Sequence, residues 1–565
     1  MIIPVGFYFT RFSDASTTMN ILSLFILFGS VEGFITAKRA ALPFARLKIN
    51  SGVPASILER RAIIDPMTKD SEPVTPAMLV QTALSFMPTR VLLTAVQLNL
   101  FTTLEEAKDG SMTNDEIREC LNLHKRALPD FTDALVSLKI LDREGDGENA
   151  RYSNSRDASF FLVKGKETYI KELEKCSDIY YRDLIALKES LKDKQEEFVD
   201  YGLIKTECIR ATNEKMSKAQ RVSDASPDYI IDIGFGFWPS RLMLTATELE
   251  LFTVLDQSET RKMTSTQVSN ALGLGTENTR KFLDSLVSLD MLNCERPGDT
   301  TLYFNTPATE AFLLKSNFES YIGGLMEMFS SRLYGFWFDL ADGLKTGKAQ
   351  NEAKNSTWSF DSLYEDQDRL EQFMMAMMGS SAADLRLFAQ KIDFSPYKTL
   401  VDTGGATGQL ASYVAQENPH MMCTSIDLPA VIPIAERCIE KWGVADRVKA
   451  VACNFFEEDI PKADIITMSR ILHDWGLEAK LSLIKKAYDA LPSNGVLVAI
   501  ESIIDDERRV NTNGLLISLC MLIETGEVGG FDFSHADFNK WCLQVGFKRT
   551  ECFPLVGTSA VFAYK

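Results

Sequence analysis

The feature that most constrains how this chain can fold is an internal repeat at a constant offset of 151 residues. Phe86–Leu104 (FMPTRVLLTAVQLNLFTTL) aligns with Phe237–Leu255 (FWPSRLMLTATELELFTVL), and the same offset relates two LVSL tetrapeptides further along, without an insertion. A match of this length indicates that one structural unit occurs twice. We call the two units copy 1, residues 72–163, and copy 2, residues 227–316.

Each copy has the pattern of a small, mainly α-helical domain with a two-stranded wing. Apolar residues follow helical spacing, and a Gly-Asp turn at Gly145-Asp146 or Gly298-Asp299 separates two short strands. This order predicts two tandem winged-helix domains. Such domains bind DNA or mediate dimerisation, and the balanced charges of the helix predicted at Asn278–Asp290 favour an interaction or dimerisation module.

Composition narrows the range of functions. The 565 residues carry a formal net charge of −18 with a pI near 4.9, which argues against a nucleic-acid partner because phosphate binding needs clustered Lys and Arg. The ten cysteines include no CxxC pair, and the four histidines are His124, His420, His473 and His535. We therefore expect no metal site, and we expect a small molecule as the partner.

The first 71 residues have the character of a targeting segment. The apolar run Ile21–Val31 has the length of a signal-peptide core and is too short to span a bilayer, so no stable membrane span is expected. A basic, acid-poor stretch follows it up to Asp65. This two-part pattern predicts import into a plastid. The alternatives are a secretory signal, or a mitochondrial presequence if Met19 rather than Met1 is the true start.

Two helical segments connect the repeated units to the rest of the chain. Residues 164–226 have the pattern of a charged helical linker, and residues 317–396 that of an apolar, aromatic connector. The helix predicted at Asp368–Gln390 contains Phe373 and Met377. Methionine adapts both to irregular core gaps and to ligands, so these side chains are candidates for the core and for a substrate pocket.

Residues 397–565 alternate strands and helices, which is typical of an α/β domain with a mostly parallel sheet. A short strand leads into the loop Asp402-Thr-Gly404-Gly405, and a second strand ends at Asp427. The glycines let the backbone approach a ligand. An acid at the end of the second strand can accept hydrogen bonds from both hydroxyls of a ribose. Because an acid inside the loop repels a pyrophosphate, the pair favours a cationic sulfonium nucleoside over a dinucleotide.

Two further strands bring polar and aromatic side chains to the same edge of the predicted sheet. The third strand leads to Asn454, which can bond an adenine edge, and to Phe455, which can cover the ring. The fourth strand leads through Ser469 to His473. Open α/β sheets bind ligands at the carboxyl ends of their strands, so His473 is predicted to face the ligand.

These motifs resemble the class II small-molecule O-methyltransferases of the caffeic-acid and acetylserotonin type. That family carries a winged-helix dimerisation domain before a Rossmann-like domain with a mostly parallel seven-stranded sheet that binds S-adenosylmethionine. The resemblance covers about Pro227 to Lys565. Its motifs are LVDTGGATG (Leu400–Gly408), SIDLP (Ser425–Pro429), NFFEEDIP (Asn454–Pro461), RILHDW (Arg470–Trp475) and the segment Gly529–Asp532.

The resemblance implies the roles of particular residues. His473 would be the general base, with Glu501 and Asp532 beside it to fix its tautomer and stabilise the imidazolium. The residues expected to contact S-adenosylmethionine are Asp402, Gly404, Gly405, Asp427, Leu428, Asn454, Phe455, Ser381 and Ser469. Those expected at the methyl acceptor are Phe373, Met377, Asp474 and Trp475.

The chain departs from the family pattern at three places. Cys453-Asn454 stands where the family usually has Gly-Asp, which puts the recognition of adenine in doubt. Ala406 replaces the third glycine of the loop, and Asp532 replaces a glutamate that is one methylene longer. The retained histidine and acids still favour a hydroxyl acceptor that must lose a proton.

Two questions stay open at this point. The acceptor could instead be the thioether sulfur of a 2-hydroxy acid, as in a related branch that serves dimethylsulfoniopropionate synthesis, or the chain could be a scaffold that keeps the fold without turnover. The two copies could pack against each other as a pseudo-dimer within one chain, or copy 2 could form a homodimer with its own image in a second chain.

Overall fold

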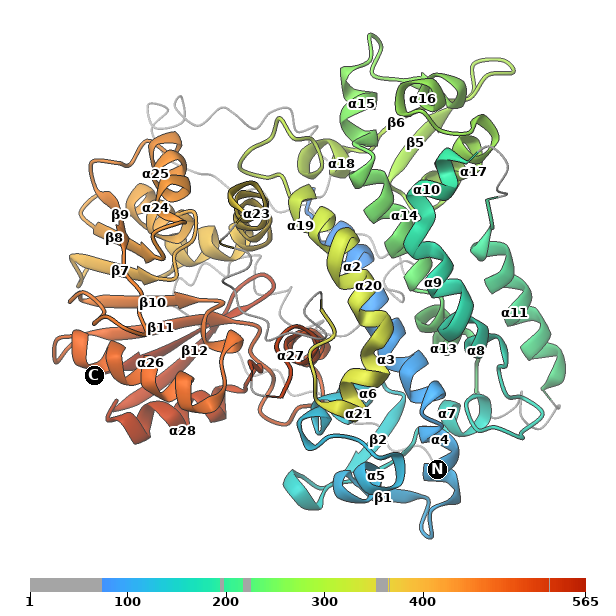
Figure 1. Cartoon of the computed structure of the whole chain (residues 1–565), viewed down its shortest axis with the longest axis horizontal. Helices are drawn as coiled ribbons and strands as arrows, with labels where there is room; N and C mark the ends of the chain where they lie inside the picture. The colour runs from blue at the N-terminus through green and yellow to red at the C-terminus, as the bar shows by residue number, and fades with distance from the viewer. Residues whose placement is uncertain (1–73, 194–197, 217–224, 352–363, 365, 528) are drawn as a thin grey trace, which may run out of the picture. The chain divides into compact units, whose positions relative to one another are not determined.

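The computed structural model describes residues 74–193, 198–216, 225–351, 364, 366–527 and 529–565. The targeting segment predicted for residues 1–71 lies outside these described residues. Within them, a largely helical N-terminal part that contains two small sheets is followed by a C-terminal part built on one seven-stranded sheet (Figure 1).

Copy 1 contains helices and a small antiparallel sheet whose strand order is β1-β3-β2. The sheet has three strands, one more than the predicted two-stranded wing, because the three residues of β1 are too short to show an alternating pattern in the sequence. The elements are α2 (Ala77–Leu84), α3 (Phe86–Gln97), α4 (Leu100–Glu106), β1 (Ser111–Thr113), α5 (Asn114–Leu121), α6 (Asp130–Ser137), β2 (Leu141–Glu144) and β3 (Arg151–Asn154).

Copy 2 repeats this arrangement down to individual hydrogen bonds. The hydroxyl of Tyr152 donates to Asp133 at 2.8 Å, and the equivalent Tyr303 donates to Asp284 at 2.7 Å. The two small sheets therefore match in strand order and in this side-chain contact. The elements are α13 (Asp228–Gly234), α14 (Phe237–Glu248), α15 (Leu251–Gln257), β4 (Met263–Thr264), α16 (Ser265–Leu272), α17 (Thr276–Ser288), β5 (Leu292–Glu295) and β6 (Leu302–Asn305).

The two copies pack directly against each other through their first two helices. Helix α2 contacts α14, while the equivalent α13 contacts α3. The hydrogen bonds across this interface run in both directions: Thr89 donates to the carbonyl of Ile233 at 2.6 Å, and its equivalent Ser240 donates to that of Ala83 at 2.7 Å. Equivalent elements thus meet reciprocally, as the two halves of a two-fold arrangement do.

This interface also accounts for the apolar character of the segment Ala77–Gln97. Its 21 residues are long and apolar enough to cross a membrane, with a mean hydropathy of 1.3. In the structure 67% of the most apolar window is buried inside the protein, where α2 and α3 contact copy 2. A buried core helix satisfies the same criterion of length and composition.

The repeat continues beyond both copies, at an offset of 153 residues. The first part of the segment predicted as a charged linker, residues 164–226, is therefore a second repeated unit, and the two-residue change of offset concealed it in the sequence. The first set is α8 (Glu172–Lys175), η5 (Cys176–Tyr180), α9 (Tyr181–Asp183), η6 (Leu184–Ala186) and α10 (Leu187–Lys192). The second set is α19 (Gly323–Met328), η7 (Phe329–Leu333), α20 (Tyr334–Phe336), η8 (Trp337–Asp339) and α21 (Leu340–Thr346).

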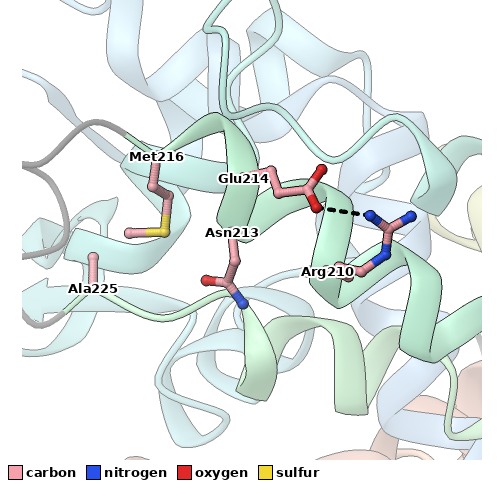
Figure 2. Close-up of a pocket in the computed structure, with 5 residues that line it drawn as sticks. All are labelled: Arg210, Asn213, Glu214, Met216 and Ala225. Atoms are coloured by element: carbon pink, nitrogen blue, oxygen red, sulfur yellow. Dashed lines mark hydrogen bonds and ion pairs between the residues drawn. The ribbon is translucent and has the colours of Figure 1, made fainter.

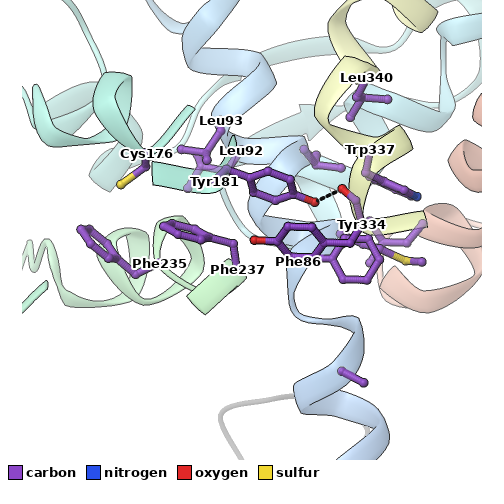
Figure 3. Packing of buried hydrophobic residues seen from close by; sticks show 14 of the residues in the cluster. Phe86, Leu92, Leu93, Cys176, Tyr181, Phe235, Phe237, Tyr334, Trp337 and Leu340 are labelled. Carbon is purple, nitrogen blue, oxygen red and sulfur yellow. Dashed lines mark hydrogen bonds between the residues drawn. The ribbon is translucent and has the colours of Figure 1, made fainter. Parts of the chain in front are cut away.

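Equivalent aromatic residues of these two sets meet at the centre of the helical part. The rings of Tyr181 and Tyr334 stack with their centroids 4.4 Å apart, and the Tyr181 hydroxyl donates to the Tyr334 carbonyl at 2.8 Å. Figure 3 shows this pair between Phe86 of copy 1 and Phe237 of copy 2. A residue that stacks on its own repeat equivalent marks the local two-fold axis.

Two buried arginines, one from each half, donate hydrogen bonds across the same local two-fold axis. Arg90 donates to the carbonyl of Trp337 at 3.1 Å, and its equivalent Arg241 donates to that of Leu184 at 2.8 Å. Trp337 and Leu184 are themselves equivalent residues, so each arginine reaches into the other half. A buried guanidinium needs such partners, because an unpaired buried charge is strongly destabilising.

The C-terminal part contains the predicted mostly parallel seven-stranded sheet, in the order β12-β13-β11-β10-β7-β8-β9. Strand β13 is antiparallel to both of its neighbours, and every other neighbouring pair is parallel. The strands are β7 (Thr399–Thr403), β8 (Met422–Asp427), β9 (Val448–Ala452), β10 (Ile465–Ser469), β11 (Val496–Glu501), β12 (Arg549–Pro554) and β13 (Ser559–Tyr564). Parallel strands β7 to β11 end at one edge of the sheet, which is where open α/β sheets bind ligands.

Helices cover the sheet and connect it to the helical part (Figure 1). Helix α23 packs against both α19 and α24, and α27 packs against α6 of copy 1. Copy 1 therefore reaches the C-terminal part even though copy 2 precedes it more closely in the sequence. These helices are α23 (Gln367–Lys391), α24 (Gln409–Glu417), α25 (Ile432–Lys441), α26 (Leu477–Ala490), α27 (Thr512–Thr525) and α28 (His535–Val545). Helix α11 (Tyr201–Lys215) belongs to the helical part, where it packs against α13.

Candidate active site

The loop after β7 leaves no room for side chains at its two consecutive glycines. A Cβ on Gly404 would lie 2.3 Å from Cδ1 of Ile471, and its φ of +68° disfavours other residues. A Cβ on Gly405 would lie 2.1 Å from Oγ of Ser425. The backbone of this loop is therefore bare and tightly packed, as a close approach to a ligand requires.

Asp427, the last residue of β8, lies next to this loop and is 8% exposed. One carboxylate oxygen accepts from the backbone N–H of Ala406 at 2.9 Å and the other from that of Leu428 at 2.7 Å. Burial raises the pKa of Asp427 to about 6, against the lowering effect of these two bonds. Each oxygen keeps a lone pair for a further donor, so the carboxylate can receive a diol.

Asp402 does not lie in the loop, where the sequence analysis placed it. It is the fourth residue of β7, is 2% exposed, and accepts from the hydroxyl of Thr467 on the neighbouring strand at 2.8 Å. Burial raises the pKa of Asp402 to about 7, and the nearby charge of Asp427 adds to the shift. The loop begins two residues later because the strand pairing extends through Thr403.

Asn454 and Phe455 follow β9, as predicted. The side-chain oxygen of Asn454 accepts from the backbone N–H of Phe456 at 3.1 Å, which fixes its orientation locally. The ring of Phe455 comes within 3.7 Å of the position that a Cβ on Gly404 would take. The aromatic ring and the bare glycine loop therefore face the same space.

Ser381 and Ser469 lie on elements that are tied together by an arginine. Ser469 ends β10, and the following residue, Arg470, donates to the hydroxyl of Ser380 on α23 at 2.7 Å. Ser381 is the next residue on that helix and is 8% exposed. Arg470 was not singled out in the sequence. Its positive φ of +56° at the end of a strand is a feature that only the structure reveals.

The predicted catalytic residues come together in one buried cluster. Nδ1 of His473 lies 3.6 Å from Oδ1 of Asp532, and Nε2 lies 3.4 Å from Oδ1 of Asp474. Glu501 ends β11, is fully buried, and accepts with Oε1 from the backbone N–H groups of Ile471 and Leu472 at 3.1 and 2.9 Å. The strand end thus holds the turn that carries His473.

Several polar atoms of this cluster have no hydrogen-bond partner among the described residues. They are Nδ1 of His473, Oε2 of Glu501 and both carboxylate oxygens of Asp532. Native proteins rarely leave buried polar groups unpaired, so such a concentration points to a place where a ligand or a transferred proton is received. The ligand atoms of His473, Glu501 and Asp532 lie within 4.8 Å of one another, so they could also reach one cation, a possibility that the sequence spacing did not indicate.

The carboxylates control the protonation of His473. Burial, the largest single effect, lowers the pKa of His473, but Asp474, Glu501 and Asp532 together outweigh it and raise the pKa to about 10. Burial raises the pKa of Glu501 to about 7. The imidazole and the acids therefore share protons and titrate as one coupled group.

The four residues predicted at the acceptor lie on two elements. Phe373 and Met377 are partly buried on α23, where Phe373 packs into the core of the C-terminal part and Met377 against the helical part. Asp474 and Trp475 follow His473, and the Trp475 ring makes an edge-to-face contact with Phe456 at 4.5 Å.

A buried lysine beside the cluster was missed in the sequence. Lys480 is 0% exposed, and its Nζ donates to the carbonyls of Trp475 and Phe531 at 2.5 and 2.9 Å and lies 3.5 Å from the centre of the Phe531 ring. Burial lowers the pKa of Lys480 to about 7. It ties the turn after His473 to the segment before Asp532.

A cavity of about 550 Å³ lies away from this cluster, in the helical part (Figure 2). It is lined by residues of α11 and by Met216 and Ala225. Its one cation, Arg210, is already paired with Glu214 at 2.7 Å. It brings together no group of residues that could carry out acid–base chemistry.

Comparison with known proteins identifies the class. An O-methyltransferase domain matches residues 337–548, and an O-methyltransferase dimerisation domain matches twice, at residues 80–164 and 231–315. The tetracenomycin polyketide synthesis 8-O-methyl transferase TcmO of Streptomyces glaucescens is 30% identical over 321 residues, which are 57% of this chain and 91% of that protein. The N,N-dimethyltransferase OxyT of Streptomyces rimosus is 31% identical over 277 residues, 49% of this chain and 78% of that protein.

A solved structure agrees with the fold. Human N-acetylserotonin methyltransferase in complex with S-adenosylmethionine matches with a TM-score of 0.55 at 24% identity, covering 62% of this chain and 98% of that one. The matched domains define the class as a methyltransferase. The chain belongs to the O-methyltransferase family, whose members methylate small molecules. These two relatives match over most of their own length, but the match covers only about half of this chain. This chain therefore carries a large part that they lack.

Proposed function

We propose that this enzyme methylates a hydroxyl group of a small molecule with His473 as the general base. The observation that carries the proposal is the buried cluster of His473 with Glu501, Asp532 and Asp474, whose unpaired polar atoms can hold and pass a proton. When bound, S-adenosylmethionine supplies the electrophilic methyl group. A neutral hydroxyl is a poor nucleophile, and a positioned base contributes roughly 10²–10⁴-fold to such a reaction.

The residues around the glycine loop fit the cofactor. Asp427 would accept from the ribose hydroxyls, Gly404 and Gly405 would let the backbone approach, and Phe455 would cover the adenine. Asp402 is shielded behind the loop by its bond to Thr467. We assign it to the support of the loop rather than to direct contact.

Protonation sets the direction of the pH dependence. The imidazole can remove a proton only in its neutral form, and the carboxylates raise the pKa of His473 to about 10. The turnover number kcat should therefore rise with pH above neutrality, by roughly tenfold per unit while chemistry limits the rate. Asp532→Asn removes one of the charges that raise the pKa of His473, so the rise of kcat should level off at a lower pH in this variant.

The deciding experiment combines two substitutions with a screen of phenolic and thioether acceptors, read as release of S-adenosylhomocysteine. His473→Ala should lower kcat on a hydroxyl acceptor by about 10²–10⁴-fold and leave the affinity for S-adenosylhomocysteine unchanged. Asp427→Ala should weaken that affinity, at about 1.5–3 kcal/mol for each lost bond to the charged group. Full activity of the His473 variant on a hydroxyl would refute the base; a thioether acceptor turned over without loss in that variant would establish the alternative.

We further propose that copy 1 and copy 2, each a winged-helix module, form a pseudo-dimer and that the chain is a monomer. The reciprocal bonds of Thr89 and Ser240 and the stacked Tyr181 and Tyr334 support this, because they occupy the surface through which a second chain would dock. Light scattering should give a mass near 63.3 kDa before any processing. A mass twice as large would favour the homodimer.

The localisation to a plastid remains a proposal based on residues 1–71. A fluorescent fusion of this segment, compared with one that begins at Met19, tests it. Plastid import that depends on the apolar run Ile21–Val31 is the expected result. Import into mitochondria by the shorter fusion would contradict it.

A further inference from the structure

Copy 1 contacts the segment that carries Asp532, and two of its side chains make the contact. Nη2 of Arg126 donates to the carbonyl of Gly530 at 2.9 Å. Gly530 in turn lies directly against the backbone of the catalytic turn, since a Cβ there would lie 1.9 Å from the carbonyl oxygen of His473. Arg126 therefore holds the segment around Gly530 that packs against the backbone of His473.

The second contact runs through a buried hydroxyl. Ser518 of α27 donates to Oδ2 of Asp130 at 2.7 Å, and its oxygen accepts from the backbone N–H of Asp532 at 3.2 Å. Asp130 is 6% exposed and Ser518 is 0% exposed. A chain of hydrogen bonds thus leads from copy 1 to the acid that faces Nδ1 of His473.

Asp130 is fixed by charge on both sides. Nη1 of Arg126 bonds its Oδ2 at 2.8 Å, and Nη2 of Arg508, in the loop before α27, bonds its Oδ1. Buried groups in such networks have little freedom to move, because any displacement leaves charges unpaired. Asp130 is therefore a rigid anchor for Ser518.

Copy 2 cannot make this contact. The residues equivalent to Arg126 and Asp130 are Glu277 and Lys281, which lie within α17 and form an ion pair with the charges reversed, at 3.7 Å. Placed against Arg508 or the Gly530 carbonyl, this reversed pair would bring like charges and like dipoles together. The difference makes the contact specific to copy 1.

We propose that Arg126 and Asp130 of copy 1 are positioning residues of the active site, which hold Asp532, and through it His473, in the geometry for proton removal. The proposal rests on the proposed role of His473 as the base. It gives copy 1 a part in the reaction of a methyltransferase domain from which it is distant in sequence.

The protonation of His473 reports on this geometry. The charged groups that face it are Asp474 on its own turn, Glu501 from β11 and Asp532 from the segment before α28, with Lys480 of α26 beside the acids. Asp532 raises the pKa of His473. A shift of Asp532 away from the imidazole should therefore lower that pKa, which a loss of packing elsewhere would not do.

The test exchanges the charged pair of one copy for that of the other in the full chain. The variant Arg126→Glu/Asp130→Lys gives copy 1 the pair found in copy 2, and keeps opposite charges at the two positions. The matched control, Glu277→Arg/Lys281→Asp, gives copy 2 the pair of copy 1. We expect the first variant to lower kcat by about 10²-fold, the scale of a small misplacement of catalytic groups, and the control to leave kcat unchanged.

A second measurement needs no acceptor and separates this proposal from the proposed function. The chain has four histidines, so selective labelling gives few resonances and His473→Gln assigns the one that matters. We expect the His473 titration to move to lower pH in the copy 1 variant and to stay in place in the control, with the affinity for S-adenosylhomocysteine unchanged in both. If no hydroxyl is methylated, the proposed function fails, while the titration still decides the positioning.

Ser518→Ala covers the case in which the exchanged pair prevents folding. It leaves the ion pairs of Asp130 intact and removes only the hydroxyl between Asp130 and Asp532. We expect a kcat about tenfold lower, comparable to the loss of one buried hydrogen bond, and a smaller shift of the His473 titration in the same direction. An unshifted titration in both variants, or an equal loss of kcat in the control, would overturn the proposal.

Discussion

Copy 1 and copy 2 have the same fold, but an equivalent ion pair on their surfaces has its charges reversed. In both copies a tyrosine of the central strand donates to an aspartate, Tyr152 to Asp133 and Tyr303 to Asp284. Copy 1 then uses Asp133 a second time, as the partner of Arg508 at 2.7 Å. The internal framework has thus been kept in both copies, while the face that meets α27 of the methyltransferase part exists only in copy 1.

The difference shows how two copies of one domain can make different contacts within a chain. The first two helices of both copies are needed for the interface between them, so their side chains stay matched. The outer face of each copy is free to differ, because each meets a different neighbour. Copy 1 packs on α27, while copy 2 is held through the segment after α10, where the backbone N–H of Phe198 donates to Asn278 at 3.3 Å.

The largest expected effect comes from breaking the contact that copy 2 lacks. Arg508→Ala leaves Asp130 and Asp133, 6% and 1% exposed, without their shared cation. Removing one partner of a buried ion pair costs about 3–5 kcal/mol, and because Asp130 keeps Arg126 and Asp133 keeps Arg143 we expect the lower end of this range in the free energy of unfolding by urea. Lys262→Ala, which removes a partly exposed pair with Glu295 in copy 2, should cost about 0–1 kcal/mol.

Equal losses in these two variants would mean that the docking of copy 1 adds no more stability than a surface pair. A loss confined to Arg508→Ala would show that copy 1 and the methyltransferase part unfold as one unit. The slope of the free energy against urea should stay constant in both variants if the unfolded states are alike.

Much of this comparison could be predicted from the sequence, and its limits have a physical cause. The repeat was visible because core positions such as Phe131 and Phe282 keep their residue type at a fixed spacing. Strands β7 to β10 were predicted because each is a short buried apolar run that ends before a loop, whereas the grouping of His473 with Glu501 and Asp532 was implied by the resemblance to the O-methyltransferases. Strand β1 was missed because it has only three residues, and the repeated unit after each copy was missed because the offset changes there from 151 to 153 residues.

The docking of copy 1 could not be predicted in the same way. Asp130 and Ser518 are 388 residues apart, and a charged helix face in a sequence usually indicates contact with solvent. The one indication in the sequence is that Arg126 and Asp130 align with Glu277 and Lys281, which have the opposite charges. A reversed pair between two otherwise matched copies indicates that the two faces have different neighbours.

A second, smaller effect should be equal in the two copies. Arg90→Met and Arg241→Met each remove a buried guanidinium that bonds carbonyls of the opposite half, such as Trp337 and Leu184. Leaving such groups unpaired costs about 1–3 kcal/mol, so both variants should lower the melting temperature by a similar amount. Light scattering should show the same mass for both; dissociation of only the Arg241 variant from a dimer would replace the pseudo-dimer by contact between copy 2 domains of two chains.

Acid should weaken the docking of copy 1 selectively. Burial is the largest effect on Asp130 and raises its pKa, but Arg126 and Arg508 outweigh it, so the pKa of Asp130 lies below its ordinary value of 3.8. A lowered pKa means that the carboxylate contributes stability above pH 3.8, and that this contribution is lost as the pH falls through the folded-state value. Copy 2 has Lys281 at the equivalent position, and no carboxylate there can be protonated.

The measurement is the urea midpoint of the wild type and of Asp130→Asn from about pH 6 to about pH 3. The wild type should be the more stable near neutrality, and the gap should narrow on acidification, since protonation makes the aspartate resemble the amide. Other carboxylates titrate in both proteins and cancel in the difference. A gap that stays constant down to the lowest pH would show that Asp130 contributes by its shape and not by its charge.

The smallest effect tests whether the two copies unfold together. Thr113 and Thr264 occupy the same position before α5 and α16, and each accepts from the backbone N–H three residues on, Glu116 at 3.3 Å and Gln267 at 3.2 Å. The side chains of Glu116 and Gln267 bond back to the threonine N–H, which completes a capping box in both copies. Replacing either threonine by alanine should cost about 1 kcal/mol, and serine should restore most of it.

If the copies form one cooperative unit, the two variants shift a single transition equally and the double variant shifts it by the sum. If copy 2, which lacks the dock on α27, opens first, Thr264→Ala alone will lower the onset of unfolding, and hydrogen exchange will be faster in α16 than in α5.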